Sequence, residues 1–426
     1  MSTKLSRLAK MSASYPEDVF TTLVHRMDVE FLKVAFGQLN RRAASGQDGV
    51  TAAEYETNLD ENLQRLHERL KSKKYRAQPS IRRWIPKRDG AKRPLAIPAL
   101  EDKIVQKAVS MLLGAVYEPM FLDCSHGFRP GRSCHTALEA LRENCRTKNI
   151  NWIVDADILG FFDNIDRGKL REVLHQRVND GGITRLIGKW FHAGIMESGQ
   201  LSVPDKGTPQ GSIVSPLLAN IFLHTVLDTW FETEVKPRMK GRCFMVRYCD
   251  DFVMGFELKT DADRLFEVLP KRFLKYNLEL NMTKTKLVQF GRPAKGATKG
   301  NGTFDFLGFT HYFGKSMKGN WTIKRKTQSK TMRAKMAIIY QWCKDNMHKP
   351  VTVQYEKLCA KLLGHYQYYG VRGNYKMLEV FFEHVERSWK YWLGRRTRNG
   401  HIKWEKFDNV YRKYLPLPKP RITQTC

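Results

Sequence analysis

Two apolar runs in the middle of the chain are typical of buried strands. "NWIVDADI" and "CFMVRYCDDFVMGF" are rich in Val, Ile and Phe, and the second run is interrupted by the adjacent acids Asp250 and Asp251. One apolar run enters this acidic pair and another leaves it, so we predict a β-hairpin with both carboxylates at its turn. A third strand is predicted at "FDFLGFTHYF", after the Gly- and Lys-rich loop 291–304.

Other segments place apolar residues three and four positions apart, as amphipathic helices do. In residues 52–72 leucines recur at this spacing, and "RGKLREVLHQRV", "PLLANIFLHTVLDTWFETEV" and "DADRLFEVLPKRFLKY" follow the same rule. Together with the predicted strands they indicate an α+β fold, with a sheet covered by helices on one side. From Thr327 onward the spacing predicts a helical bundle with basic residues between its apolar positions. We therefore predict a domain boundary near residue 316.

The charge of the chain indicates a polyanionic partner. The 426 residues carry a formal net charge of +30, and residues 321–426 alone hold 23 Lys and Arg against 7 Asp and Glu. Nucleic acid fits this charge and the interleaved aromatic residues better than an anionic membrane surface, because no basic segment has a continuous apolar face. The N-terminus lacks a signal-peptide pattern and no apolar run is long enough to cross a membrane, so we expect a cytoplasmic protein. The eight cysteines show no zinc-binding spacing and are expected to be reduced thiols.

The acidic residues of the predicted strands suggest a metal site. Two adjacent carboxylates repel each other and raise each other's pKa unless a cation neutralises them, and Mg²⁺ prefers carboxylate oxygen. Asp157 ends the other buried strand, so the two strands together supply the acids that hold two ions roughly 3.5–4 Å apart in nucleotidyl transfer. The alternative is that Asp250 and Asp251 form an ordinary polar turn. Asp155 is a further acid near this set, whereas Asp163 and Asp166 fit better as N-terminal caps of the next helix.

Two further stretches suit a nucleotide substrate. Residues 85–109 resemble a basic hairpin, with Lys87, Arg88, Lys92 and Arg93 around a Gly turn that could grip a triphosphate; a solvated basic turn is the alternative. In "KGTPQGSIVSPLLANIFL" a Gly- and Pro-rich loop displays Gln210 before an apolar helix, although an ordinary capped helix start has the same pattern.

These motifs, in this order, resemble the reverse transcriptase and maturase proteins of bacterial group II introns. The resemblance rests on "SGQDGVT", "IPKRDGAKRPLAIPALEDKIVQ", "SHGFRPGRSCHTAL", "DADILGFFDNID", "KGTPQGSIVSPLLANIFL", "RYCDDF", "LELNMTKTKLVQF", "FDFLGF" and "LLGHYQYYGVRGN", and covers nearly the whole chain. It implies a right-hand polymerase, with a helical N-terminal extension at 1–76, fingers and palm at 77–316, and a basic helical thumb and maturase domain at 317–426. It also implies RNA-directed DNA polymerase activity on an RNA template with a DNA or RNA primer, deoxynucleoside triphosphates as substrates, and structured intron RNA as a further partner.

The resemblance assigns roles to individual residues. It makes Asp157, Asp250 and Asp251 the catalytic acids that hold two Mg²⁺ ions, or Mn²⁺ as an alternative, with the backbone carbonyl of Ile158 as a further ligand. It implies nucleotide binding by Lys87, Arg93, Phe162, Gln210, Lys284 and Lys286: the first two hold the triphosphate, Phe162 blocks a ribose 2′-hydroxyl, Gln210 lies beside the incoming nucleotide, and one of the last two protonates the pyrophosphate. It implies nucleic-acid binding by Arg129, Arg132, Lys324, Arg325, Lys326, Arg395 and Arg396.

The chain departs from the family pattern at a few positions. Cys249 stands where Ala is usual before the acidic pair, Leu159 replaces a polar residue, and Thr283 replaces Glu. We also find no Cys/His cluster of the kind expected for an appended DNA-cutting domain. These departures leave two alternatives open: a free-standing relative adopted by the host for DNA repair or phage defence, and an RNA-splicing cofactor with little polymerase activity.

Overall fold

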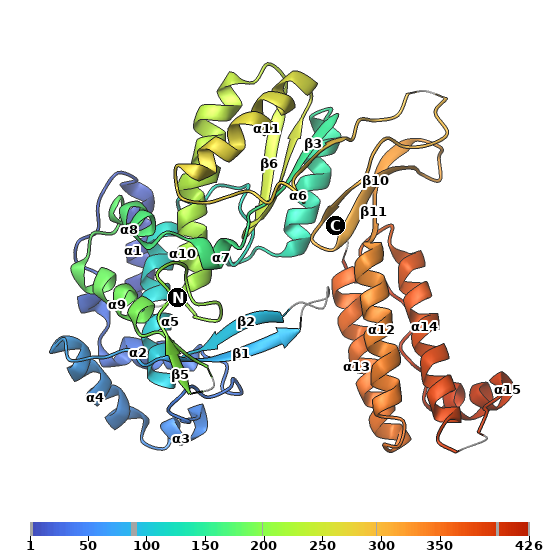
Figure 1. The fold of residues 1–426 in the computed structure, drawn as a ribbon, viewed down its shortest axis with the longest axis horizontal. Coiled ribbons are helices and arrows are strands. Elements are labelled where there is room, and N and C mark those ends of the chain that lie inside the picture. Colours follow the sequence, from blue (N-terminus) through green and yellow to red (C-terminus); the bar gives the residue numbers. More distant parts are fainter. Residues whose placement is uncertain (1–2, 87–91, 198, 295, 398–399, 425–426) are drawn as a thin grey trace. The chain divides into compact units, whose positions relative to one another are not determined.

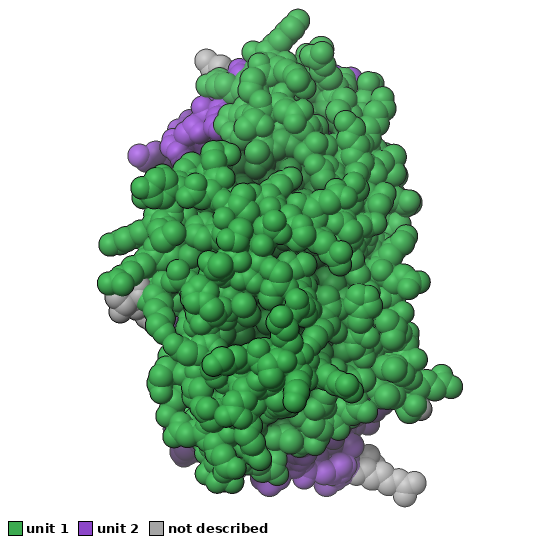
Figure 2. Space-filling view, turned by 90° about the vertical axis from the view of Figure 1, so that its left-hand side faces the viewer, with its two compact units in different colours: residues 1–133, 156–254, 260–286 green, residues 134–155, 255–259, 287–426 purple. Residues whose placement is uncertain are grey.

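The computed structural model describes residues 3–86, 92–197, 199–294, 296–397 and 400–424. Within these residues the chain forms two compact units, whose elements are drawn in Figure 1 and whose surfaces are coloured green and purple in Figure 2. The first unit comprises residues 1–133, 156–254 and 260–286, and the second comprises 134–155, 255–259 and 287–426. None of the described helices is both long and apolar enough to cross a membrane.

The first unit is mainly helical. Its helices are α1 (Thr3–Ser14), η1 (Val24–Arg26), α2 (Val29–Gly37), α3 (Ala52–Glu56), α4 (Leu59–Lys71), α5 (Leu100–Tyr117), α7 (Phe161–Asn164), α8 (Arg167–His175), α9 (Gly181–His192), α10 (Ser215–Leu223), η2 (His224–Thr229), η3 (Phe231–Val235), η4 (Lys236–Arg238) and α11 (Lys259–Leu274). Helix α5 is buried on most of its sides: 12 of its 18 residues are buried, and it packs against α1, α2 and α10. Most of its buried side chains are apolar, so α5 lies in the core of this unit.

A four-stranded sheet of the first unit contains the predicted basic hairpin. Strands β1 (Ser80–Pro86) and β2 (Lys92–Ile97) pair antiparallel, as the sequence predicts, while the turn that joins them lies outside the described residues. Strand β4 (Ile195–Glu197) lies parallel to β1 and pairs with β5 (Gln200–Ser202), which gives the order β2-β1-β4-β5.

A second four-stranded sheet contains both of the predicted apolar strands. Its order is β6 (Cys243–Tyr248), β7 (Asp251–Phe256), β3 (Trp152–Asp157) and β8 (Lys286–Gln289). Residues 243–247 and 252–256 are all buried. The predicted hairpin is confirmed: β6 and β7 are neighbours, and the chain turns between them at Cys249 and Asp250.

The second unit combines a three-stranded antiparallel sheet with long helices. The sheet has the order β11 (Trp321–Thr327), β10 (Phe309–Lys315), β9 (Phe304–Phe306). The helices are α6 (Cys134–Thr147), α12 (Ser329–Asp345), α13 (Val351–Tyr369), α14 (Tyr375–Gly394), α15 (Trp404–Lys406) and η5 (Phe407–Arg412). Helix α14 packs against α12 and α13 (Figure 1). Its buried Trp389 donates a hydrogen bond to Gln354 of α13. The helical bundle predicted after Thr327 is therefore present, and the mixture of helices and sheets confirms the α+β class.

One local prediction is refined and two are wrong. Residues 52–72 are helical as predicted, but they form two helices, because Asn58 leaves the helical conformation and the Asn62 side chain binds the carbonyl of Tyr55. "FDFLGFTHYF" is a hairpin instead of one strand, because Leu307 and Gly308 both have positive φ and turn the chain between β9 and β10. Asp166 caps α8 as predicted, but the side chain of Asp163 accepts hydrogen bonds from Gln210 instead of capping a helix.

Candidate active site

The turn between β6 and β7 holds its acids in a constrained backbone. Cys249 has φ of +60°, which is uncommon for a residue other than glycine. Gly127 of a neighbouring loop lies directly against it: a Cβ atom built at position 127 would lie 2.4 Å from the Cys249 Sγ and 2.5 Å from its backbone nitrogen. Only glycine fits at 127 while Cys249 keeps this position. The turn is therefore shaped from outside by the loop as well as by its own sequence.

Asp157 lies at the end of β3 with its side chain half-exposed. Its carboxylate accepts a hydrogen bond from Lys284 Nζ at 3.0 Å, and its backbone carbonyl accepts one from Asn281 N at 2.8 Å. The next residue, Ile158, is buried and forms an antiparallel bridge with Leu280. The segment 280–284 thus fixes the end of β3, and it brings Lys284 to Asp157 across 127 positions of sequence.

The electrostatics of Asp250 link it to Asp157. Burial raises the pKa of the Asp250 carboxyl above its usual value, and the nearby negative charge of Asp157 raises it further. A hydrogen bond to its own backbone and the positive charges of Arg93 and Arg247 act in the opposite direction. A bound cation would relieve the repulsion between Asp157 and Asp250, which is the electrostatic condition of a metal site.

The donors fit a hard cation in their chemistry. Asp157, Asp250 and Asp251 supply only carboxylate oxygen, and the Lys284 ammonium already provides a positive charge at Asp157. Among the described residues, however, no three His, Cys, Asp or Glu side chains are gathered closely enough to form a metal-binding group. The structure therefore brings together Asp157, Lys284 and the acidic turn without an assembled set of metal ligands.

Phe162 and Gln210 lie on two segments that contact each other: the short helix α7 contains Phe162, and the loop before α10 contains Gln210. Phe162 lies in α7, where its ring meets that of Phe161 edge-on, and its backbone carbonyl accepts a hydrogen bond from Thr208 N at 2.8 Å. Gly207 lies so close to this helix that a Cβ atom would be 2.7 Å from the Asp163 carbonyl oxygen. The Gln210 side chain donates to the Asp163 carboxylate, and its backbone carbonyl accepts from Ala96 N of β2. This loop therefore connects β2 with the segment that follows Asp157.

Of the other three residues predicted to bind the nucleotide, the structure describes two. Lys87 lies outside the described residues. Arg93 is exposed on β2, and its charge acts on Asp250 as noted above. Lys286 is exposed at the start of β8, two positions after Lys284.

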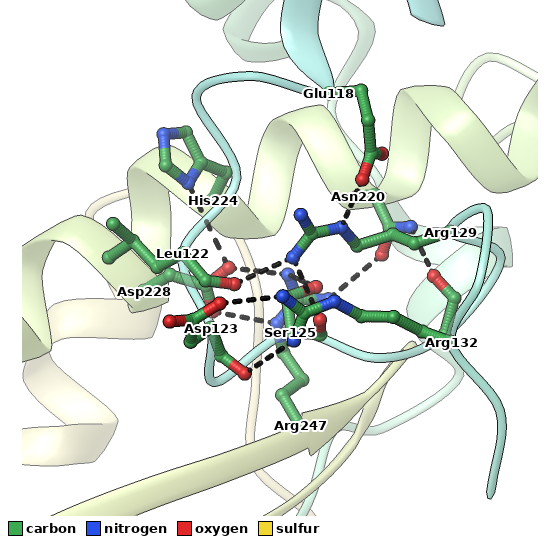
Figure 3. Close-up of polar contacts among 11 residues, drawn as sticks. Glu118, Leu122, Asp123, Ser125, Arg129, Arg132, Asn220, His224, Asp228 and Arg247 are labelled. Carbon is green, nitrogen blue, oxygen red and sulfur yellow. Dashed lines mark hydrogen bonds and ion pairs between the residues drawn. The ribbon is translucent and has the colours of Figure 1, made fainter. Parts of the chain in front are cut away.

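Two arginines of the loop 122–132 stabilise that loop. Arg129 is buried, and its guanidinium donates to Glu118 and to the carbonyls of Leu122 and Ser125. Arg132 donates to the carboxylate and the carbonyl of Asp123 (Figure 3). These contacts give both arginines a role in holding the loop, and they argue against Arg129 as a contact for phosphate.

In the second unit, some of the residues predicted to bind nucleic acid are accessible, and others are buried or bound within the fold. On β11, Lys326 is exposed and Lys324 half-buried, whereas Arg325 is 2% exposed and lies 3.8 Å from Glu139. After α14, Arg395 is exposed and covers the ring of Tyr391, whereas Arg396 donates to the carbonyls of Met347 and Lys349. Lys324, Lys326 and Arg395 therefore remain available to a ligand, and Arg325 and Arg396 serve the fold.

The thiol next to the acids is not reactive in this environment. Burial, and to a smaller degree the charge of Asp250, raises the pKa of Cys249 to about 12. The thiol therefore stays protonated at neutral pH. The seven cysteines that the structure describes form no disulfide with one another, in agreement with the prediction of reduced thiols.

The sequence analysis missed a polar cluster directly behind the acidic turn. Arg247 and Asp228 are both fully buried and form an ion pair, with Asn220 and Ser125 beside them (Figure 3). The motif "RYCDDF" contains Arg247, but its partner lies 19 positions earlier in a helix, so no local pattern indicates the pair.

Comparison with known proteins gives a family for this part of the chain. Residues 85–311 match the family described as reverse transcriptase (RNA-dependent DNA polymerase), and this range contains Asp157, Asp250 and Asp251. The chain is 39% identical over 224 residues to the group II intron-encoded protein LtrA of Lactococcus lactis subsp. cremoris; the match covers 52% of this chain and 37% of LtrA.

Two further proteins are also similar in sequence to this chain. Protein YkfC of Escherichia coli strain K12 is 32% identical over 273 residues, which are 57% of this chain and 71% of YkfC. The mitochondrial nuclear intron maturase 4 of Arabidopsis thaliana is 30% identical over 186 residues, which are 42% of this chain and 21% of that protein. The matched region thus spans little more than a third of LtrA and about a fifth of the plant maturase.

Proposed function

The chain belongs to the reverse transcriptase (RNA-dependent DNA polymerase) family, in its group II intron-encoded branch, and on this premise we propose that it extends a primer on an RNA or DNA template with deoxynucleotides. The single observation that supports this best is the hairpin β6–β7. It presents Asp250 at a constrained turn where the charge of Asp157, from a different strand, acts on it. An ordinary polar turn does not need an acid of a second strand whose charge acts on it.

We infer that Asp157, Asp250 and Asp251 bind two Mg²⁺ ions, which would supply Lewis-acid charge at the transferred phosphate. The carbonyl of Ile158 is proposed as a further ligand, since it directly follows Asp157. Lys284 neutralises Asp157 in the structure and is proposed to donate a proton to the pyrophosphate that leaves. Lys87, Arg93 and Lys286 are proposed to bind the triphosphate through charge.

Phe162 and Gln210 are proposed to select the sugar and position the base. Phe162 is half-buried on the short helix that follows β3, so its ring has little freedom to move away from a 2′-hydroxyl. Gln210 is held at its backbone by β2, which fixes the point from which its side chain extends. Both residues therefore have the rigid support that a selective site needs.

The domain assignment remains part of the proposal. We propose fingers and palm at 77–316, after a helical extension at 1–76, and a thumb and maturase domain at 317–426, in the cytoplasm.

Primer extension tests the proposed activity. The purified protein with Mg²⁺, a DNA primer on an RNA template and all four deoxynucleotides should extend the primer, and the variant Asp250→Asn/Asp251→Asn should not. Asp166→Asn is the matched control: Asn also caps helices well, so this acid-to-amide change should leave extension intact. Equal extension by the parent and the double variant would refute the site assignment.

A second function, binding of structured intron RNA during splicing, is favoured by the charge of the second unit. Residues 321–426 carry an excess of 16 positive charges, and Lys324 and Lys326 are not fully buried on β11. Because counterion release drives such binding, affinity should fall steeply with salt, and Lys324→Gln/Lys326→Gln should reduce the logarithmic salt slope by about 1.5. Splicing of a group II intron by the Asp250→Asn/Asp251→Asn variant would separate this function from synthesis. A host role in DNA repair or phage defence would use the same chemistry.

A further inference from the structure

Arg247 uses every hydrogen-bond donor of its guanidinium in a fully buried site. Nε and one terminal nitrogen bind the two carboxylate oxygens of Asp228, and the same terminal nitrogen donates to Ser125 Oγ at 2.8 Å. The other terminal nitrogen donates to Asn220 Oδ1 at 3.0 Å and to the backbone carbonyl of Cys249 at 2.9 Å. These five bonds match the five N–H groups of arginine, and no other side chain can supply that set.

The partners come from separate segments, and this guanidinium contacts all of them. Asn220 lies in α10 and Asp228 in the π-helical stretch η2 that continues it, while Ser125 belongs to the loop before α6 (Figure 3). Cys249 belongs to the acidic turn itself. Arg247 therefore connects a helix, a loop and the turn through one rigid planar group.

The loop is also bound to the edge of β6 through its backbone. Arg247 N donates to the Cys124 carbonyl at 2.7 Å, and His126 N donates to the Arg247 carbonyl at 2.8 Å. The amide of Asn220 donates to the Gly127 carbonyl at 2.6 Å, and Gly127 is the residue pressed against Cys249. Arg247 and Asn220 therefore hold the loop and the turn in fixed positions relative to each other.

Stability alone is a weak reason for such a pair. Burying two charges costs several kcal/mol per ion, and well-packed apolar residues often serve equally well in their place. Cys249, by contrast, has a positive φ, and a conformation of this kind persists only when the surroundings hold it. The carbonyl that Arg247 holds precedes Asp250 directly, so a shift of that carbonyl moves the acidic pair.

We propose that Arg247 is a positioning residue for the polymerase site: neutralised by Asp228, it holds the Cys249 carbonyl and thereby sets the places of Asp250 and Asp251. This inference rests on the proposed function, because it assumes that the acids bind divalent metal. The buried Arg247–Asp228 pair would then serve metal binding and catalysis at the turn in addition to folding.

The test measures metal binding and catalysis separately. Arg247→Lys keeps the charge opposite Asp228 but supplies only three donors from one point. We expect it to weaken Mn²⁺ binding, measured by calorimetry, roughly 10- to 100-fold, as the loss of a partner that orients metal ligands does. We expect kcat to fall by a similar factor, with KM for deoxynucleotide within about twofold and the Mg²⁺ concentration for half-maximal rate raised.

Arg177→Lys is the matched control. Arg177 is also a buried arginine of the first unit, but its guanidinium binds the carbonyls of Ser12 and Asp18, far along the chain from the turn. Its substitution should lower the melting temperature and leave Mn²⁺ affinity and the Mg²⁺ dependence unchanged. If Arg247→Lys behaves like this control, Arg247 is merely structural and the inference fails.

Two further outcomes are decided in advance. If Arg247→Lys does not fold, Arg247→Met/Asp228→Leu replaces it, since this pair leaves no unbalanced charge; normal Mn²⁺ affinity in that variant would overturn the inference. If the parent binds Mn²⁺ but does not extend primers, the proposed function fails and the Mn²⁺ comparison alone decides the inference. A parent that does not bind Mn²⁺ at all would refute both.

Discussion

Two hairpins carry the opposite charges of this protein, and each contains a buried arginine. The hairpin β6–β7 places Asp250 in its turn and Asp251 at the first position of β7, with Arg247 behind them in five hydrogen bonds. The hairpin β10–β11 carries Lys324 and Lys326 along one strand, with Arg325 between them facing the interior. In the first hairpin Arg247 binds the backbone carbonyl of Cys249, directly before the acids, whereas in the second Arg325 lies 3.8 Å from Glu139.

Under the proposed function, the two hairpins use their charge differently. Catalysis would require acids in fixed places, which agrees with a turn that is held from several sides. Binding of a phosphate backbone would need charge at a surface but little geometric precision, which lysines on one face of a strand can supply. The first hairpin should therefore respond to substitution in its rate, and the second in its affinity and stability.

The largest effect is expected at Asp157, the acid on the neighbouring strand. Asp157→Asn keeps the shape of the side chain but removes the charge that Lys284 pairs with. We expect kcat for single-nucleotide incorporation to fall on the order of 10³-fold, which is about 4 kcal/mol, because a metal-binding acid acts throughout the reaction. Binding of primer–template should stay within about twofold. A fall in affinity with unchanged kcat would place Asp157 in the binding surface instead.

The next effect concerns stability in the basic hairpin. Arg325→Met removes a guanidinium that is 2% exposed, together with its 3.8 Å contact to Glu139, and should lower the free energy of unfolding by about 2 kcal/mol because buried polar partners of the guanidinium lose a donor. Lys326→Gln, one position along the same strand, should change it by less than about 0.5 kcal/mol because its side chain is exposed. Urea unfolding of both variants checks this. Equal effects would mean that Arg325 is not the structural residue of this strand.

A smaller effect is expected for Phe162. Phe162→Ala removes the ring that we propose excludes a 2′-hydroxyl, so the preference for deoxynucleotides over ribonucleotides should fall about tenfold or more. The ratio of kcat/KM for the two substrates measures this. Phe161→Leu is the control, because the neighbouring Phe161 is buried in the core. An unchanged ratio in Phe162→Ala would remove this residue from the nucleotide site.

The smallest effect is a pH dependence of stability at the acidic turn. The pKa of Asp250 is raised in the folded protein, so its protonated form favours folding. Its contribution is present below the usual value of 3.8 and is lost as pH rises through the raised pKa. Without divalent metal, Asp250→Asn should therefore unfold at higher urea than the parent at pH 7.5, and the difference should shrink at pH 4.5. Mg²⁺ should stabilise the parent and not the variant.

Structural features that depend on residues close together in the sequence could be predicted from it. The strand pattern around Asp250 and Asp251, the antiparallel pair β1–β2 and the cap at Asp166 each follow from local alternation or local hydrogen bonding. The burial of Arg325 could also have been read from the alternation of β11, because its neighbours Lys324 and Lys326 point to the opposite face. The family resemblance instead assigned all three residues to nucleic-acid binding.

The sequence could not reveal contacts between distant segments. Arg247 meets Ser125 across 122 positions, and Asp157 meets Lys284 across 127. The turn at Leu307 was missed for a similar reason: leucine rarely has positive φ, and here the Tyr368 hydroxyl of α13 donates to its carbonyl. Such features depend on tertiary packing, which no local pattern encodes.

One measurement tests the central claim most directly: primer extension at increasing primer–template concentration by the parent, Asp250→Asn/Asp251→Asn and Lys324→Gln/Lys326→Gln. Our account predicts that the acidic variant loses kcat on the order of 10³-fold or more while it still binds primer–template. The basic variant should keep kcat at saturation and show a raised KM for primer–template. If the acidic variant instead keeps its kcat, the turn between β6 and β7 is not the catalytic site.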